Sequence, residues 1–129
     1  MKPFRSTLQR LRAGTAPHAL WTSLAILALL VGAGRIALTW RDLTQIIDEP
    51  WHIACGMEYL SEGKYQLEFQ HPPLARIAVA IGPYLRGIRS FGIPDPVEEG
   101  NAILYANNAY WGNLVAARAG TLPFFLLGG

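Results

Sequence analysis

Two adjacent carboxylates, Asp48 and Glu49, have the clearest potential for chemistry in this chain. Pro50 follows them, and because proline is tolerated only in the first turn of a helix, a helix is predicted to begin at Asp48 or Glu49. His52 shares a helix face with Glu49. A carboxylate here can accept the proton of an attacking hydroxyl as a general base. The simpler interpretation is that one acid only caps the helix, whose free N–H groups and dipole favour negative charge.

A second polar group follows at His71-Pro72-Pro73-Leu74, with Arg76 close behind. A double proline is typical of a structural corner, and Pro73 is predicted to open a helix. His71 and Arg76 would offer hydrogen-bond donors to a phosphate. Arg118 is a charge partner for a phosphate or for the acid pair, or else a residue whose charge reaches the membrane surface from a membrane helix.

A divalent metal held by Glu49, His52 and His71 is an alternative for the same residues. The trio lacks the paired histidine or cysteine spacing of zinc sites, so we assign no metal and no cofactor. Cys55 is the chain's one cysteine, which excludes an internal disulfide.

A hydrophobic segment ends shortly before Asp48 and must therefore position the acid pair. Residues 13–34 contain no Lys, Arg, Asp or Glu. Trp21 and Trp40 would lie about 28 Å apart along a helix, close to the thickness of a bilayer core with a tryptophan at each interface. We therefore predict a transmembrane helix over 13–40. A signal peptide cleaved near Val31-Gly32-Ala33 is the alternative, but the apolar run exceeds the usual signal-peptide length of about 7–15 residues.

Charge is distributed unevenly along the 129 residues, of which 51% are hydrophobic and 16% charged. The first 12 residues include four basic residues and no acid, whereas all 9 acids lie between Asp42 and Glu99. This asymmetry predicts a cytoplasmic basic arm over 1–12 and an exported loop over 41–117. The basic arm is therefore interpreted as a topology signal, and nucleic acid is not expected as a partner.

Within the exported loop, three helices are expected. The first ends at Gly63 and is followed by a short extended segment over 65–70. The second begins at Pro73, bends at Gly82-Pro83 and carries an apolar stripe with arginines beside it, as in a helix lying in the membrane interface. Asn101 is predicted to cap the third. Residues 118–129 turn apolar again and are interpreted as the start of a truncated second transmembrane helix, so the chain is expected to be the N-terminal part of a longer protein.

This order of elements resembles the N-terminus of glycosyltransferase family 39, which includes protein O-mannosyltransferases and lipid A aminoarabinose transferases. The matching residues lie within 20–125: Asp48-Glu49, His52, Gly63-Lys64-Tyr65, His71-Pro72-Pro73-Leu74 and Arg118. The resemblance implies an all-α integral membrane protein of the GT-C fold. Members of that family move a sugar from a polyprenyl-phosphate carrier to an acceptor on the non-cytoplasmic side of the membrane.

By that resemblance, Asp48 is the base that activates the acceptor, Glu49 and His52 support it, and the His71 corner lies beside the carrier phosphate. Some aminoarabinose transferases have lysine where His71 stands. The implied partners are a polyprenyl-phosphate-linked sugar and a lipid or protein acceptor. The implied location is a bacterial-type inner or plasma membrane, with the N-terminus in the cytoplasm. The rival hypothesis is a non-enzymatic, membrane-anchored protein whose exported loop binds partners and in which Asp48 only caps a helix.

Overall fold

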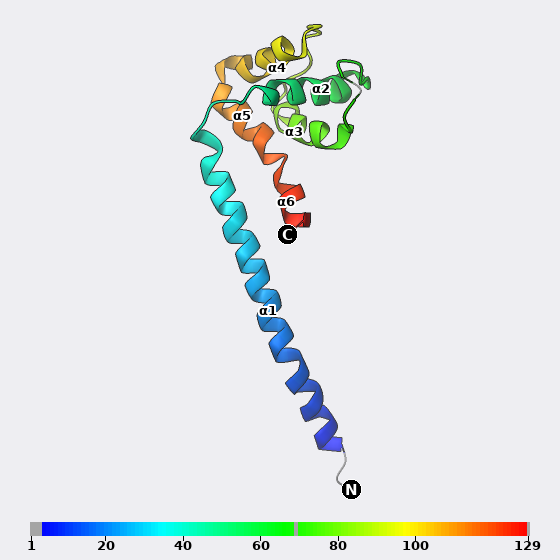
Figure 1. The fold of residues 1–129 in the computed structure, drawn as a ribbon, viewed down its shortest axis with the longest axis vertical. Coiled ribbons are helices and arrows are strands. Elements are labelled where there is room, and N and C mark those ends of the chain that lie inside the picture. Colours follow the sequence, from blue (N-terminus) through cyan, green and yellow to red (C-terminus); the bar gives the residue numbers. More distant parts are fainter. Residues whose placement is uncertain (1–3, 69, 129) are drawn as a thin grey trace. The chain divides into compact units, whose positions relative to one another are not determined.

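The computed structural model describes residues 4–68 and 70–128, with side-chain surroundings from His18 onward. Every regular element in this part of the chain is a helix, which confirms the all-α prediction (Figure 1). The chain divides into two compact units, Met1–Arg35 and Ile36–Gly129. All candidate site residues belong to the second unit.

Helix α1, Phe4–Leu38, is followed by a short 3-10 turn, η1, Thr39–Arg41. The helix already begins inside the basic arm. Residues His18–Arg41, 24 in number, are long and apolar enough to cross a membrane, and their most apolar stretch has a mean hydropathy of 1.8. Within the described part of the chain, this is the one helix that meets both conditions. A signal sequence near an N-terminus also passes this test of length and composition, so the structure does not decide between the two alternatives.

Helix α2, Asp48–Glu62, has the predicted bounds. Its first turn contains Pro50, and its end is set by Gly63, which adopts the left-handed conformation with φ 68° and donates its N–H to the Tyr59 carbonyl at 2.9 Å. The segment after it contains no strand among its described residues, so the extended element predicted over 65–70 is not regular structure. Buried Glu58 holds this segment, because its Oε2 accepts the N–H groups of Gln66 and Leu67 at 2.8 and 3.0 Å.

Helix α3, Pro73–Leu85, opens at the predicted proline and continues through Pro83. It packs against α2 and α5, with Arg76, Ala80 and Pro83 buried. The prediction that Arg76 lies beside an interfacial stripe is therefore wrong. Three residues of that stripe, Leu74, Ile81 and Leu85, do remain exposed. One face of α3 is therefore apolar and uncovered by the described residues.

Three further helices complete the second unit: α4, Pro96–Tyr105; α5, Tyr110–Ala119; and α6, Leu122–Gly128. A 3-10 turn, η2, Ala106–Asn108, joins α4 to α5. Asp95 caps α4, because its Oδ1 accepts the N–H groups of Val97 and Glu98 at 2.9 and 2.8 Å. The prediction that Asn101 caps this helix is wrong, since Asn101 lies inside it. The segment expected to start at residue 118 is interrupted, because α5 ends at Ala119 and α6 begins only at Leu122.

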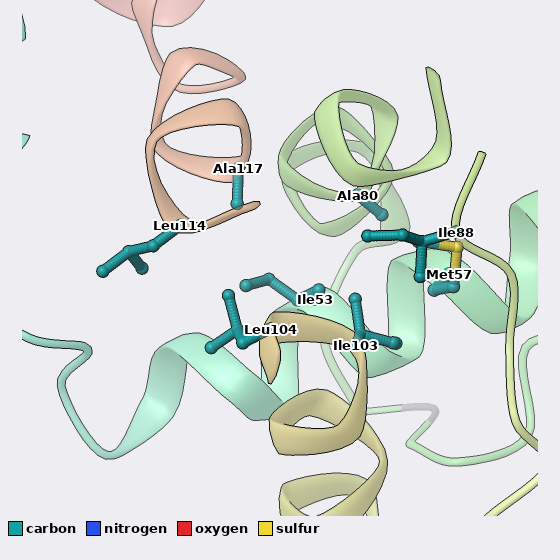
Figure 2. Packing of buried hydrophobic residues seen from close by; sticks show 8 residues of the cluster. All are labelled: Ile53, Met57, Ala80, Ile88, Ile103, Leu104, Leu114 and Ala117. Atoms are coloured by element: carbon teal, nitrogen blue, oxygen red, sulfur yellow. The ribbon is translucent and has the colours of Figure 1, made fainter. Parts of the chain in front are cut away.

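A small hydrophobic core joins α2, α3, α4 and α5 (Figure 2). Its buried members are Ile53, Met57, Ala80, Ile88, Ile103, Leu104, Leu114 and Ala117. The helices approach closely at glycines. A methyl group on Gly56 would overlap the backbone carbonyl of Arg76 on α3, and one on Gly100 would overlap the carbonyl of Pro50. The start of α2 is therefore held tightly between α3 and α4.

Candidate active site

The two acids at the start of α2 have different surroundings. Asp48 is exposed, and no hydrogen bond or ion pair joins its side chain to another described residue. Glu49 is partly buried, and its Oε2 accepts the N–H of Ile46 at 2.9 Å. The N-cap residue Ile47 makes no side-chain cap, and the N–H that Glu49 accepts belongs to Ile46, just before the helix. Since no first-turn N–H of α2 donates to Asp48 among the described residues, Asp48 does not act as the helix cap.

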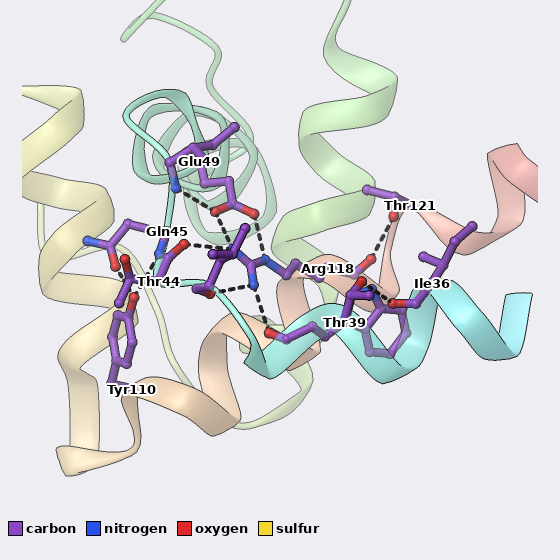
Figure 3. Close-up of polar contacts among 11 residues, drawn as sticks. Ile36, Thr39, Thr44, Gln45, Glu49, Tyr110, Arg118 and Thr121 are labelled. Atoms are coloured by element: carbon purple, nitrogen blue, oxygen red, sulfur yellow. Dashed lines mark hydrogen bonds and ion pairs between the residues drawn. The ribbon is translucent and has the colours of Figure 1, made fainter.

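Arg118 clamps Glu49 and the segment before it (Figure 3). Its Nε and Nη2 donate to the two carboxylate oxygens of Glu49, at 2.8 and 2.9 Å. Nη1 donates to the carbonyls of Trp40 and Leu43 at 2.7 and 2.9 Å. Nη2 also donates to the carbonyl of Thr44 at 3.0 Å. A guanidinium group has five N–H bonds, and each is engaged here. Of the two charge roles predicted for Arg118, the structure contains the pairing with one acid of the pair, Glu49.

Gln45, next to Thr44, anchors the same segment to two other helices. Its N–H donates to the hydroxyl oxygen of Tyr110 on α5 at 2.9 Å, and that hydroxyl donates to the side-chain oxygen of Gln45. Its side-chain amide donates to Asn101 on α4 at 3.1 Å. The segment between α1 and α2 is therefore held from both sides.

A second cluster surrounds Arg76, whose exposed fraction is 4%. Its guanidinium forms an ion pair with Glu68 and donates to the hydroxyl of Tyr65 at 3.1 Å. Its Nε donates to Nδ1 of His52 at 3.1 Å. Glu68 also lies 3.0 Å from Nδ1 of His71. Arg76 thus connects α2, α3 and the segment between them.

The contacts with Arg76 and Arg118 alter the proton affinities of Glu68 and Glu49. Burial would raise the pKa of Glu68, but hydrogen bonds from Arg76, the Gln70 N–H and His71 outweigh it and lower the pKa to about 2. Burial would likewise raise the pKa of Glu49, and the hydrogen bonds from Arg118 and the Ile46 N–H lower it. Both groups are therefore carboxylates at neutral pH.

His52 and Cys55 are affected by burial in opposite senses. Burial lowers the pKa of His52, and the charge of Arg76 lowers it further. Burial raises the pKa of the Cys55 thiol to about 11. The thiolate is the nucleophilic form of cysteine, so Cys55 is inert at neutral pH.

A polar cleft of about 560 Å³ opens beside the start of α2. It is lined by Asp48, Trp51, His52, Glu68, Gln70, His71 and Arg76. An apolar groove of about 500 Å³ shares three of these residues with it. The groove is lined by His52, His71, Pro72, Leu74, Ala75, Arg76, Val79, Thr121 and Phe124. A polar hollow beside an apolar one can hold a ligand with a charged head and an oily tail.

The cleft brings together four of the predicted site residues: Asp48, His52, His71 and Arg76. The other two, Glu49 and Arg118, line a separate small cavity of about 140 Å³ that His52 also borders. The proposed metal trio is not assembled, because Glu49 pairs with Arg118, His52 with Arg76 and His71 with Glu68. Among the residues that the structure describes, no group of three or more His, Cys, Asp or Glu is placed to hold a metal ion.

Glu68 and Trp51 are site residues that the sequence reasoning missed. Glu68 neutralises Arg76 and orients His71, and Trp51 forms one wall of the cleft. The available signal for Glu68 was an acid three residues before His71. The signal for Trp51 was an aromatic residue in the first turn of the predicted helix, two residues after Glu49.

No family model, curated protein or solved structure matches this chain.

Proposed function

We propose that this chain forms the acceptor-activating and carrier-binding part of a membrane glycosyltransferase of the GT-C type. The observation that carries the proposal is the contrast between the two acids. Glu49 is fully engaged by Arg118, whereas the carboxylate of Asp48 is exposed and unpaired among the described residues, at the edge of a cleft lined by two histidines. An unpaired carboxylate at a cleft is what a general base requires.

In the proposed reaction, the donor is a sugar linked to a polyprenyl phosphate. The acceptor hydroxyl transfers its proton to Asp48 while its oxygen forms a bond to the anomeric carbon of the sugar. The bond between that carbon and the carrier phosphate breaks, and the phosphate leaves with the electron pair. The proton ends on Asp48 and the negative charge on the released phosphate, so the charges balance.

The carrier's two halves suit the two adjoining hollows. Its phosphate would lie in the polar cleft near His71, with buried Arg76 behind it. Its isoprenoid tail would follow the apolar groove toward Leu74 and Phe124. Because the five N–H bonds of Arg118 are already engaged, its proposed role changes from contacting phosphate to holding Glu49 and the preceding segment in place.

The proposed location follows from the candidate span at His18–Arg41. Basic residues precede this span and acidic residues follow it, which favours a cytoplasmic N-terminus with the cleft on the outer face of the membrane. Sugar transfer from a lipid carrier needs the site at the water–lipid boundary, and Trp40, at the end of the span, belongs to the unit that contains the cleft.

The test is Asp48→Asn, measured as sugar transfer in membranes that contain the protein. Because the Asp48 side chain makes no hydrogen bond or ion pair with the described residues, the variant should insert and fold normally. Loss of the base should lower the rate about 10²–10⁴-fold. Asp42→Asn is the matched control, since it removes an exposed acid from the segment before α2 without touching the cleft. Near-normal turnover by Asp48→Asn would refute Asp48 as the base.

The rival function, a membrane-anchored binding protein, is favoured by a different observation. Leu43, Ile46 and Ile47, directly before α2, are 60–83% exposed. Apolar groups gathered on a surface are typical of contact sites for proteins or membranes. Under this alternative, neither Asp48→Asn nor Asp42→Asn changes function, whereas replacing Ile46 and Ile47 with serine abolishes partner binding.

A further inference from the structure

The ring of His52 lies where three hollows of the second unit meet. It lines the polar cleft together with Asp48, the apolar groove together with Phe124 and the small cavity together with Arg118. The side chain is partly buried on α2, one turn after Asp48. A ligand in either of the two larger hollows therefore borders this ring.

The hydrogen bond from Arg76 decides which ring nitrogen carries a proton. Nε of Arg76 lies 3.1 Å from Nδ1 of His52. A guanidinium group can only donate hydrogen bonds, so Nδ1 must be the unprotonated acceptor. The single ring proton then sits on Nε2. No described residue accepts a hydrogen bond from Nε2, which leaves this N–H for a ligand.

Arg76 is itself held in place by its surroundings. It is 4% exposed, forms an ion pair with Glu68 and donates to the hydroxyl of Tyr65. The backbone carbonyl of Arg76 packs directly against Gly56 of α2. The donor cannot leave Nδ1 without breaking these contacts. The tautomer of His52 is therefore determined by the packing of α2 against α3.

The groups that face the ring act on a second proton in both directions. They come from α2, α3, α5 and the segment before α3: Asp48, Glu49, Glu68, His71, Arg76 and Arg118. Glu49 and Arg118 neutralise each other, and Glu68 is paired with Arg76, whereas the charge of Asp48 raises the pKa of His52. A proton on Nδ1 would end the hydrogen bond from Arg76 and place a positive charge against the guanidinium. Burial acts in the same direction and lowers the pKa of His52.

We propose that His52 is an uncharged hydrogen-bond donor whose Nε2–H contacts an anionic oxygen of the ligand in the cleft, with Arg76 as its positioning residue. The identification of the anion as a lipid phosphate rests on the proposed function above. The fixed tautomer of His52 is independent of that function. A neutral donor gives a directed hydrogen bond whose strength does not change between neutral and alkaline pH, unlike that of a histidine cation. It also keeps its proton while the phosphate departs.

The tautomer is tested by nitrogen NMR of the whole chain in lipid nanodiscs, labelled at its 3 histidines and 4 tryptophans. We expect the Nε2–H form of His52 at pH 7 and a pKa below the ordinary value of about 6.5. In Arg76→Met the two tautomers should mix and the pKa should rise toward that value, a change that a merely structural role for Arg76 would not produce. A cationic ring or an Nδ1–H tautomer in the unmodified chain overturns the inference. The tautomer is measured in the unmodified chain, so this test does not depend on whether a variant folds.

Ligand contact is tested by titrating the same sample with geranyl phosphate and, separately, with inorganic phosphate. We expect the Nε2 resonance of His52 to move with either probe, and the indole resonance of Trp51, another cleft residue, to move with it. Tighter binding of geranyl phosphate would identify the lipid-linked form as the ligand, whereas equal binding would identify phosphate alone. His52→Phe, which keeps a ring but loses the donor, should weaken binding about 10- to 100-fold. His18→Phe, on α1, is the control and should bind as the unmodified chain does.

The outcomes separate the two proposals. If geranyl phosphate moves Trp51 but leaves His52 unchanged, or if His52→Phe binds normally, the contact is refuted while the carrier proposal survives. If neither probe moves any cleft resonance, both the contact and the carrier assignment fail.

Discussion

Arg118→Lys tests the clamp at the start of α2 in isolation from the cleft. Lysine keeps the positive charge, so Glu49 is not left with an unpaired charge. Its ammonium group has three N–H bonds in place of five. The variant must therefore lose at least two of the hydrogen bonds that Arg118 makes to Glu49 and to the carbonyls of the preceding segment.

The size of the effect follows from those lost bonds. A net contribution of about 1 kcal/mol for each hydrogen bond gives a local destabilisation of about 2 kcal/mol. Since about 1.4 kcal/mol corresponds to a factor of ten, the segment should open roughly 30-fold more often. The opening should be confined to residues near the clamp, because the hydrophobic core does not include Arg118.

Hydrogen exchange of the backbone amides in nanodiscs measures this opening directly. The N–H groups of Gln45 and Ile46 report it, since they donate to Tyr110 and to Glu49, respectively. Both should exchange roughly 30-fold faster in Arg118→Lys, while amides in the middle of α2 keep their protection. Arg41→Lys is the matched control, because Arg41 is exposed and makes no side-chain hydrogen bond to a described residue.

Unchanged exchange at both amides in Arg118→Lys would refute the clamp as the element that orders this segment. Faster exchange across the whole second unit would refute it differently, by showing that Arg118 supports the fold globally. Glu49→Gln provides a cross-check, since it removes the charge from the other side of the same contact and should speed exchange at Ile46 in particular.

Three further predictions concern packing, a buried acid and pH. Gly56→Ala should lower stability by about 1–3 kcal/mol in thermal unfolding, because the added methyl overlaps the carbonyl of Arg76, whereas Gly34→Ala, with open space around it, should not. Glu99→Gln should lower the free energy of unfolding by about 2 kcal/mol in the same assay. The substitution replaces one carboxylate oxygen of this buried residue with an NH₂ group, which would face the hydroxyl or N–H donors that now bind Glu99. The folded-state pKa of Glu68 lies below its ordinary value of 4.5, so its stabilisation is complete above pH 4.5 and is lost as pH falls toward about 2. Acid titration of Glu68→Gln should lack this loss, and an unchanged acid transition would contradict the pairing with Arg76.

Local rules predicted where α2 begins and ends and where α3 begins. Pro50 and Gly63 bound α2, and Pro73 opens α3, because proline and glycine restrict the backbone whatever surrounds them. The capping rule was applied to Asn101, whereas the residue that caps α4 is Asp95. Asn101 and Asp95 are both good capping residues, but Pro96 follows Asp95 directly and marks the first helical position there.

Contacts between distant residues could not be predicted from the pattern. Glutamate is a residue type that is rarely buried, yet Glu58 and Glu99 are both buried and accept backbone N–H groups from neighbouring loops. Asn113 is buried as well, and its side-chain amide donates to carbonyls at the end of α4. Burial of a polar group depends on which loop packs over it, and that is decided by the fold rather than by residue type. The candidate site was predicted as a set of residues, but its division into a clamp and a cleft was not.

The clamp also has a consequence for the order in which the protein forms during synthesis. Arg118 lies 69 residues after Glu49 and 78 residues after Trp40 in the sequence. When the ribosome has made α2, the acids are present but the guanidinium that separates their roles is not. Until Arg118 emerges, the carbonyls before Glu49 lack their donor, and Glu49 has only the nearby N–H of Ile46. The charge of Glu49 therefore stays unpaired on the nascent chain, like that of Asp48, and the two acids differ in charge pairing only once α5 has been made.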